Sequence, residues 1–267
     1  MKEMDLCKKT LRLGNEKYNK YGSRMIIVDY KDARYITVYF PDYNYYKNTS
    51  WSSFNKGTVK SPYCRTVFGV GYIGEGKYKT HNSDGTPTEY YARWKAMLER
   101  CYYKKDKVKG KNLTYEDCIV EEYLLNFQNY AEWLDEQVKN CPFEEWYIDK
   151  DILEKGNKIY DRKHMILVDR RLNNLFTKSD KARGDYPIGS SPHKRDNVLE
   201  VWCSTYEDGE KNKKYLGRFP LDQVEEAFLT YKRFKENYIK QVADEYKNSI
   251  PDKVYQALYN YEVEITD

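Results

Sequence analysis

Apolar and polar residues alternate in short runs over the first part of the chain. Three such runs lie at 25–28, 35–40 and 67–70, and turn-forming residues separate them. Alternation with a period of two puts successive side chains on opposite faces of a strand. Gly, Pro, Asn and Asp favour the turns between strands. The pattern predicts a small antiparallel β module over residues 1–70.

The spacing of apolar residues becomes helical after residue 86. The segment Thr86-Pro87-Thr88-Glu89 offers a threonine to cap a helix, a proline at its first position and a glutamate three residues after the cap. Apolar residues then recur at helical spacing up to Cys101, and a second such stripe predicts a helix over about 121–139. Both stripes are typical of faces buried in a core.

The glycines of residues 69–76 do not fit a dinucleotide-binding loop. Such a loop stands between a strand and a helix that opens at its last glycine. Here a lysine-containing stretch and a polar Asn/Asp/Gly segment follow instead. We therefore expect a glycine-rich linker.

Residues 147–178 combine strand and turn signals with carboxylates, an imidazole and amides. We expect a strand that ends in Asp149-Lys150-Asp151, a loop with a Gly-Asn turn, a second strand at 165–168 and a short helix that opens near Asp169. Oxygen donors and an imidazole that converge in this way favour a hard divalent cation, Mg²⁺ or a similar metal ion.

The last part of the chain predicts a sheet followed by a helix. Three short strands are expected at 188–195, 198–206 and 213–219, followed by a helix that Asp222 caps and that Pro251 ends. At 267 residues the chain exceeds one typical domain. The predicted fold class is α+β, in three parts: the small N-terminal β module at 1–70, a central helical and ββα region at 71–184, and a C-terminal three-stranded antiparallel sheet packed on a helix at 185–267.

Composition narrows the function only slightly. A net charge of +4 comes from 46 basic and 42 acidic residues, so attraction to phosphate has to come from local patches such as the lysine-rich loop at 104–111. The 29 tyrosines suit both small cores and surfaces that stack on bases. The six cysteines form no Cys-x-x-Cys pair, which favours reduced thiols over a zinc site. Neither a run of about eighteen apolar residues nor the apolar core of a signal peptide occurs, so we expect a cytoplasmic protein with no membrane partner.

The segment 147–178 resembles the HNH nuclease family, and more closely the HNH-like proteins of bacteriophages and homing elements. His164-Met165 stands where many members have Asn-Leu, residues 166–168 form the following strand, and Asn173 falls nine residues after His164. The resemblance implies a ββα-metal fold in which a first-strand histidine activates water and a divalent metal is held nearby. The helix around Trp94, the helix around Trp133 and the turn at 173–176 also resemble phage HNH-type proteins, which implies a phage or prophage origin and action on DNA in the host bacterial cytoplasm.

The family's first-strand histidine is absent here, and Asp149-Lys150-Asp151 occupies its position. A carboxylate takes a proton from metal-bound water only if the pKa of the carboxylate is raised or the metal has already lowered the pKa of the water far enough. A lysine would need a strongly depressed pKa. Two interpretations stay open. In one, Asp149, Lys150 and His164 are catalytic beside a metal ion whose ligands are Asp149, Asp151, His164 and Asn173. In the other, the ββα unit is only a scaffold that docks on DNA.

The segment from 188 to 231 resembles DNA-binding domains of the apetala/ethylene-response-factor type. The matching residues include Gly189, the basic turn at 193–195, Trp202 and the Leu216–Phe219 strand end. In that family the exposed face of the sheet lies in the major groove. The resemblance implies DNA contacts by His193, Lys194, Arg195, Trp202, Lys213, Lys214 and Arg218. A core position for Trp202 is an equal alternative.

Two functions follow as hypotheses. The first is a phage DNA-binding protein that resembles HNH homing-type endonucleases and has double-stranded DNA as its partner. Whether this protein also cleaves DNA with a divalent metal ion is the question that this hypothesis leaves open. It predicts salt-sensitive binding that weakens when charge is removed at Lys194, Arg195 and Arg218. The second is a catalytically inactive phage interaction protein that binds and inhibits a host nucleic-acid-handling or defence complex, because tyrosine-rich surfaces also suit protein hot spots.

Overall fold

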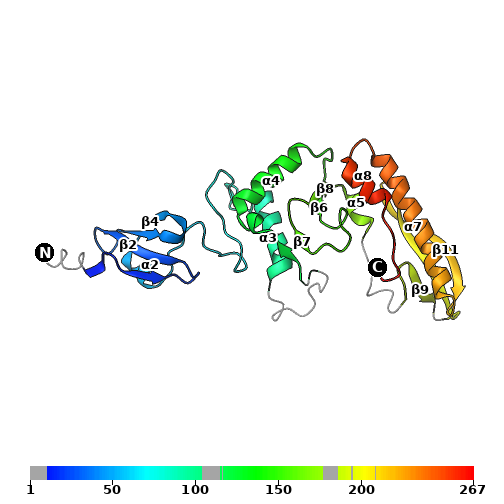
Figure 1. Cartoon of the computed structure of the whole chain (residues 1–267), viewed down its shortest axis with the longest axis horizontal. Helices are drawn as coiled ribbons and strands as arrows, with labels where there is room; N and C mark the ends of the chain where they lie inside the picture. Colours follow the sequence, from blue (N-terminus) through cyan, green and yellow to red (C-terminus); the bar gives the residue numbers. More distant parts are fainter. Residues whose placement is uncertain (1–10, 104–114, 116, 177–185, 194, 208) are drawn as a thin grey trace. The chain divides into compact units, whose positions relative to one another are not determined.

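The computed structural model describes residues 11–103, 115, 117–176, 186–193, 195–207 and 209–267. Over these residues the chain is mixed α+β, which confirms the predicted fold class. The described residues form six α-helices and four small sheets, and Figure 1 labels many of these elements along the chain. None of the described helices has the length and apolar character needed to cross a membrane. The lysine-rich loop at 104–111 lies outside the described residues.

Two compact units make up the chain. The first comprises Met1–Glu136 and Lys158–Tyr160, and the second comprises Gln137–Asn157 and Asp161–Asp267. This division is coarser than the three predicted parts, 1–70, 71–184 and 185–267, whose boundaries stay predictions.

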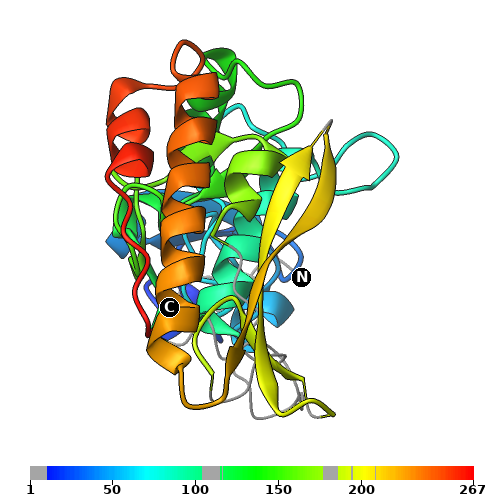
Figure 2. The ribbon, with the colours of Figure 1, turned by 90° about the vertical axis from the view of Figure 1, so that its right-hand side faces the viewer.

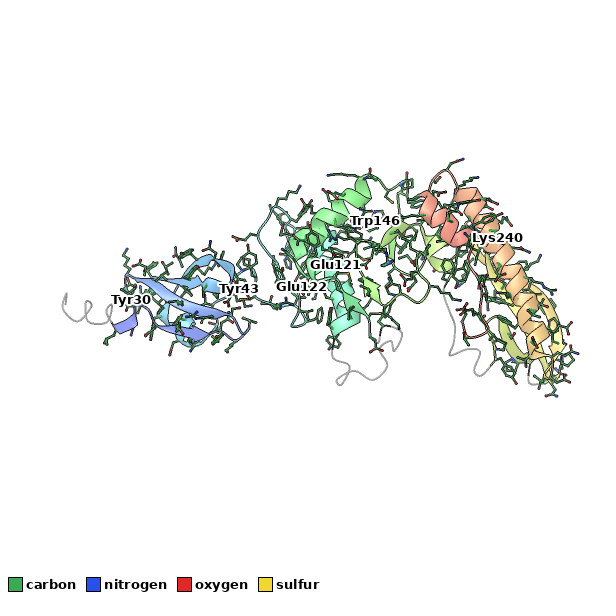
Figure 3. The ribbon with its side chains drawn as sticks, in the orientation of Figure 1. Tyr30, Tyr43, Glu121, Glu122, Trp146 and Lys240 are labelled. Atoms are coloured by element: carbon green, nitrogen blue, oxygen red, sulfur yellow. The ribbon has the colours of Figure 1, made fainter. Side chains whose placement is uncertain are left out.

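A four-stranded antiparallel sheet forms the predicted N-terminal β module. Its strands follow one another in the order β1 (Glu16–Tyr18), β2 (Arg24–Tyr30), β3 (Ile36–Phe40) and β4 (Tyr45–Thr49). Every second residue of β3 is buried, and in β2 the buried residues are Met25, Ile27 and, after a bulge, Tyr30. These side chains pack on Phe54 of the short helix α2 (Trp51–Asn55). Tyr30 lies in this core and Tyr43 packs against it, and both are labelled in Figure 3.

The run at 67–70 does not form the strand that its apolar residues predict. Phe68 and Gly69 both have positive φ, at 51° and 78°, and they make a turn that Val67 and Gly71 close by an isolated bridge. A left-handed backbone at two successive residues breaks the extended conformation that a strand requires.

Helix α3 (Glu89–Tyr102) and helix α4 (Phe127–Lys139) confirm the two apolar stripes. A 3-10 turn, η4 (Glu122–Leu125), precedes α4. The indole of Trp94 is fully buried, and its Nε1 donates to the carbonyl oxygen of Leu124 at 2.8 Å. The predicted cap is wrong by two residues: Thr88 caps α3, because a bridge between His81 and Pro87 holds the preceding residues extended.

The glycine-rich stretch packs closely against α3 and the start of α4, and so does more than link two parts of the chain. A Cβ on Gly71 would lie 2.4 Å from a methyl group of Leu98, and one on Gly76 would lie 2.4 Å from Oε1 of Gln128. The Gln128 amide also donates to the Tyr78 carbonyl and accepts from the Tyr78 N–H, at 2.9 and 3.0 Å. A side chain at either position would force its packed neighbour to shift, which favours glycine there.

The ββα segment folds locally as its sequence predicts. Strand β6 (Tyr147–Asp149) pairs antiparallel with β8 (Ile166–Val168), and helix α5 (Arg170–Asn174) follows. Asp169 caps α5 by accepting from the N–H of Leu172 at 2.8 Å. The two-residue strand β7 (Ile159–Tyr160) pairs in parallel with β5 (Ile119–Val120) in the first unit.

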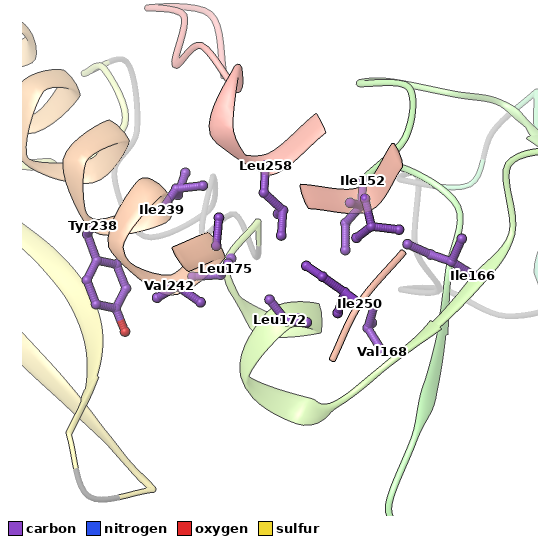
Figure 4. Packing of buried hydrophobic residues seen from close by; sticks show 12 residues of the cluster. Ile152, Ile166, Val168, Leu172, Leu175, Tyr238, Ile239, Val242, Ile250 and Leu258 are labelled. Carbon is purple, nitrogen blue, oxygen red and sulfur yellow. The ribbon is translucent and has the colours of Figure 1, made fainter. Parts of the chain in front are cut away.

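The apolar side of this segment is covered by the end of the chain. Helices α7 (Val224–Tyr246) and α8 (Asp252–Tyr259) supply half of the shared core. Figure 4 shows this cluster, which joins Ile152, Ile166, Val168, Leu172 and Leu175 to Tyr238, Ile239, Val242, Ala243, Ile250, Val254 and Leu258. The ββα segment is therefore a part of the second unit's core.

A three-stranded antiparallel sheet packs on the first half of α7, as predicted. Its order is β11 (Glu210–Pro220), β10 (Val198–Glu207), β9 (Ser190–His193). Figure 2 shows the yellow strands β10 and β11 alongside the orange helix α7. Alternate residues of β10 are buried against that helix. The predicted cap at Asp222 is wrong, since α7 begins after Gln223, which lies in a turn closed by Pro220.

The contact between Gly189 and Tyr231 gives a test of this packing. Gly189 has a φ of +82°, and a Cβ there would lie 2.0 Å from the Tyr231 ring. We expect Gly189→Ala to lower the free energy of unfolding by about 2–4 kcal/mol, through overpacking and backbone strain together.

Gly209→Ala is the matched control, because Gly209 has a φ of +81° with open space around it. It should cost only about 1 kcal/mol. Urea unfolding followed by circular dichroism measures both, and equal losses in the two variants would contradict the close packing of Tyr231 on Gly189.

Candidate nucleic-acid interface

One face of the C-terminal sheet is turned to solvent, and the register of β10 and β11 fixes which residues it presents. Residues directly opposite each other in an antiparallel pair share a face. Because Cys203 and Thr205 are buried, the residues that alternate with them face outward, and Trp202 is 37% exposed. This excludes the core position that the sequence left open for Trp202. We call this side of β10 and β11 the outward face.

An aromatic pair lies on the outward face with lysines beyond it. Trp202 is opposite Tyr215, and their ring centroids are 4.8 Å apart. Further along the hairpin, Lys213 is opposite Ser204 and Lys211 is opposite Tyr206, and both lysines are exposed. The pattern of β11 could have indicated Lys211 and Tyr215, because both lie at even spacing from Lys213.

The structure separates two of the predicted DNA contacts. Lys214 is opposite Cys203, whose side chain is buried against α7. Lys214 therefore lies on the helix side of the edge strand, whereas Lys213 lies on the outward face. Only one of the two neighbouring lysines points the same way as Trp202.

Arg218 is on the outward face, but two carboxylates hold its guanidinium group. It donates to Glu200 at 2.7 Å and to Asp196 at 3.0 Å. The hydrogen bond and the charge of Glu200 raise the pKa of Arg218, and the same contact lowers the pKa of Glu200. His193 adds a third contact, with Nδ1 3.4 Å from Asp196. This local neutralisation weakens the attraction of Arg218 for phosphate.

Two residues of the predicted basic turn remain. Arg195 is exposed in the turn between β9 and β10, where Asn197 takes a positive φ of 54°. Lys194 lies outside the described residues. The exposed cations described on or beside the outward face are thus Arg195, Lys211 and Lys213, with Arg218 already paired.

In the ββα segment, Asp149 closes the turn that follows β6. Its Oδ1 accepts from the N–H groups of Asp151 and Ile152, at 2.7 and 2.8 Å. Burial raises the pKa of Asp149, and these two hydrogen bonds oppose the rise. A raised pKa is what a carboxylate general base needs, but this oxygen is already engaged by the backbone.

Lys150 is buried and ties the two ends of the loop together. It is only 7% exposed, and its Nζ donates to Asp151 at 2.6 Å and to the carbonyl oxygen of Asn157. The Asn157 amide returns a hydrogen bond to the Lys150 carbonyl at 2.9 Å. A charged amine in such an ion pair is a poor general base.

His164 lies between two carboxylates, those of Asp161 and Glu154, which the sequence did not predict as its partners. Its Nδ1 lies 2.8 Å from Asp161, and its Nε2 lies 3.0 Å from Glu154. Both ring nitrogens of His164 therefore face carboxylate oxygens of the chain itself, and in this arrangement neither nitrogen is turned towards a separate metal position. The spacing of three residues between Asp161 and His164 is the one local signal of this arrangement.

The predicted metal ligands therefore have other partners in this arrangement. Asn173 lies half-buried on α5, with its backbone N–H bonded to the Asp169 carbonyl. In the described part of the chain, no three His, Cys, Asp or Glu side chains are grouped so that they could hold a metal ion. The residues as placed do not fit a metal centre, and the Mg²⁺ site stays a prediction from the HNH resemblance.

Comparisons with protein-family models, curated proteins and solved structures give no match. Function is therefore inferred from the residues and their contacts.

Asp149 gives a test that separates a turn-closing role from a metal-binding role. The substitution Asp149→Asn would keep the oxygen acceptor for both N–H groups and would remove the charge. Since the pKa of Asp149 is raised in the folded protein, ionised Asp149 costs stability at neutral pH, and the cost disappears as the pH falls through the folded pKa to below the unfolded value of about 3.9.

We expect Asp149→Asn to be at least as stable as the natural chain at pH 7, with the difference shrinking towards pH 3. Asp149→Ala loses both hydrogen bonds and should cost about 1–2 kcal/mol. Urea unfolding between pH 3 and 8 measures both, and equal destabilisation by the two substitutions would mean that the charge itself is required.

Proposed function

We propose that this chain binds double-stranded DNA through the outward face of β10 and β11. The observation that carries the proposal is the exposed Trp202–Tyr215 pair followed by Lys213 and Lys211, on a sheet whose other face is buried by α7. A two- or three-stranded ribbon fits the B-DNA major groove, which is about 12 Å wide. Lysines reach phosphates, while the rings supply apolar contact area.

The distribution of charge favours binding that is modest and sensitive to salt. Each lysine that neutralises a phosphate releases counterions and steepens the salt dependence. Glu200 and Asp196 form ion pairs with Arg218. The cations that remain to attract phosphate on or beside this face are therefore Arg195, Lys211 and Lys213. The likeness to apetala-type domains and to phage HNH-type proteins supports DNA as the partner and the host bacterial cytoplasm as the place of action.

For the ββα segment we propose a scaffold role. The groups that would perform HNH-like chemistry are engaged within the loop: Asp149 with backbone amides, Lys150 with Asp151, and His164 with Asp161 and Glu154. These contacts stiffen the connection between β6 and β8.

The two faces of β11 provide a matched test of duplex binding. We expect the double variant Lys211→Gln/Lys213→Gln to weaken binding of a 20-base-pair duplex and to reduce the slope of log K against log salt by about 2, if both lysines contact phosphate. Lys214→Gln removes one charge from the helix side and should leave both quantities nearly unchanged. Fluorescence anisotropy between 50 and 200 mM salt gives both.

Equal effects from the outward and the helix-side lysines would overturn the proposed face. Unchanged duplex binding, combined with a host protein that is retained after nuclease treatment and lost in Trp202→Ala, would favour the alternative of a protein partner.

The scaffold role predicts an absence of cleavage. Supercoiled plasmid incubated with the protein and Mg²⁺ or Mn²⁺ should stay intact with the natural chain, with Asp149→Ala and with Asp151→Ala. Nicking by the natural chain that disappears in both variants would instead establish the catalytic interpretation. Agarose electrophoresis separates supercoiled, nicked and linear forms.

A further inference from the structure

The N-terminal sheet has a second aromatic surface, on the side opposite its core. Its buried side chains all point towards α2, so the residues between them face the other way. The register joins Ile26 of β2 to Tyr39 of β3 and Tyr39 to Tyr46 of β4, while Tyr18 of β1 lies opposite Arg24. We call the surface formed by Tyr18, Arg24, Ile26, Tyr39 and Tyr46 the platform. Glu16 lies on the same face opposite Ile26 and forms an ion pair with Arg24 at 2.5 Å, so the attraction for phosphate has to come from the basic residues around the platform.

The platform exposes flat rings on a rigid support. Tyr18 is 66% exposed and Tyr46 is 58% exposed. The rings of Tyr39 and Tyr46 are stacked, with centroids 4.6 Å apart and an angle of 29° between their planes. The Tyr39 hydroxyl donates to the Asn44 side chain at 3.3 Å. From β1 to β4 the sheet is about 14 Å wide, room for a few unpaired bases.

The net positive charge around the platform indicates which kind of ligand it binds. Residues 11–64 contain nine Lys and Arg residues against four Asp and Glu, an excess of five positive charges in a chain whose whole net charge is +4. A protein partner would need only the rings, whereas a polyanion that also presents flat apolar faces is complementary to both the rings and the charge. Single-stranded nucleic acid has that combination.

We propose that the platform binds single-stranded nucleic acid by stacking unpaired bases on Tyr18 and Tyr46. The basic residues around the sheet would attract the phosphates. This site is separate from the outward face of the C-terminal sheet, and it does not depend on duplex binding there. Stacking is tolerant of sequence because every base has a flat face, so little base preference is expected.

Anisotropy of a fluorescent 12-nucleotide oligothymidylate, titrated with the full chain at 50 mM salt, tests the proposal. Tyr18→Ala/Tyr46→Ala should weaken binding roughly tenfold or more, because each stacked ring contributes appreciably to affinity. Tyr18→Phe/Tyr46→Phe keeps both rings and should stay within about twofold. Tyr259→Ala, at an exposed tyrosine of α8, is the control for loss of a surface ring and should have no effect.

Two further arms separate the competing explanations. An oligouridylate of the same length distinguishes RNA from DNA, and binding of either one supports the proposal. The C-terminal variant Lys211→Gln/Lys213→Gln should bind the oligothymidylate like the natural chain, and a loss as large as that of the double Ala variant would assign the binding to the other sheet.

The proposal is overturned if neither oligonucleotide binds, or if the double Ala variant binds as well as the natural chain. A change in molar mass of the double Ala variant by light scattering, without oligonucleotide binding, would assign the platform to contacts between copies of the chain. Both tyrosines are exposed, and their replacement should lower the free energy of unfolding by no more than about 1–2 kcal/mol, chiefly through loss of the Tyr39–Tyr46 ring contact. A cooperative urea transition close to that of the natural chain checks that the variants are folded.

Discussion

The shared use of helix α7 is the constraint on which the second unit depends. Its first half packs against the sheet through Ala227, Phe228 and Tyr231, and its second half packs against the ββα segment through Ile239 and Val242. A helix of 23 residues is about 35 Å long. One rigid element therefore belongs to two hydrophobic cores, and it fixes the outward face relative to the ββα loop.

Polar contacts reinforce this connection at the point where the two cores meet. The Tyr238 hydroxyl accepts from the N–H of Tyr206 at 2.7 Å, and the Asn174 amide donates to the Tyr206 hydroxyl at 2.7 Å. Asp169 joins the same region, because it caps α5 with one oxygen and accepts from the Tyr246 hydroxyl with the other. Helix α5, strand β10 and helix α7 are thus bonded to one another as well as packed.

Local signals predicted the elements, and contacts between distant residues decided the site. Alternation and helical stripes were sufficient for β2 and β3 of the N-terminal sheet, for α3 and α4, and for the C-terminal sheet on its helix, whereas β1 and β4 were not predicted and the run at 67–70 forms a turn. The side of the sheet on which Trp202 lies depends on a register that contains a bulge after Val201, which no local pattern reveals. The burial of Lys150 depends on Asn157 across the loop, and one of the two carboxylate contacts of His164 comes from Glu154, ten residues away. The residue types and spacing of the segment 147–178 are therefore compatible with side chains that make structural contacts within the loop.

The shared core has a consequence for synthesis of the chain. The apolar side of the ββα segment includes Val168 and Leu172, yet its cover includes Val254 and Leu258, which leave the ribosome roughly ninety residues later. At typical rates of elongation that interval is about 5–20 s. Until α7 and then α8 have been made, the nascent segment presents apolar surface that lacks its native cover, so the order of translation leaves residues 147–176 open to non-native contacts.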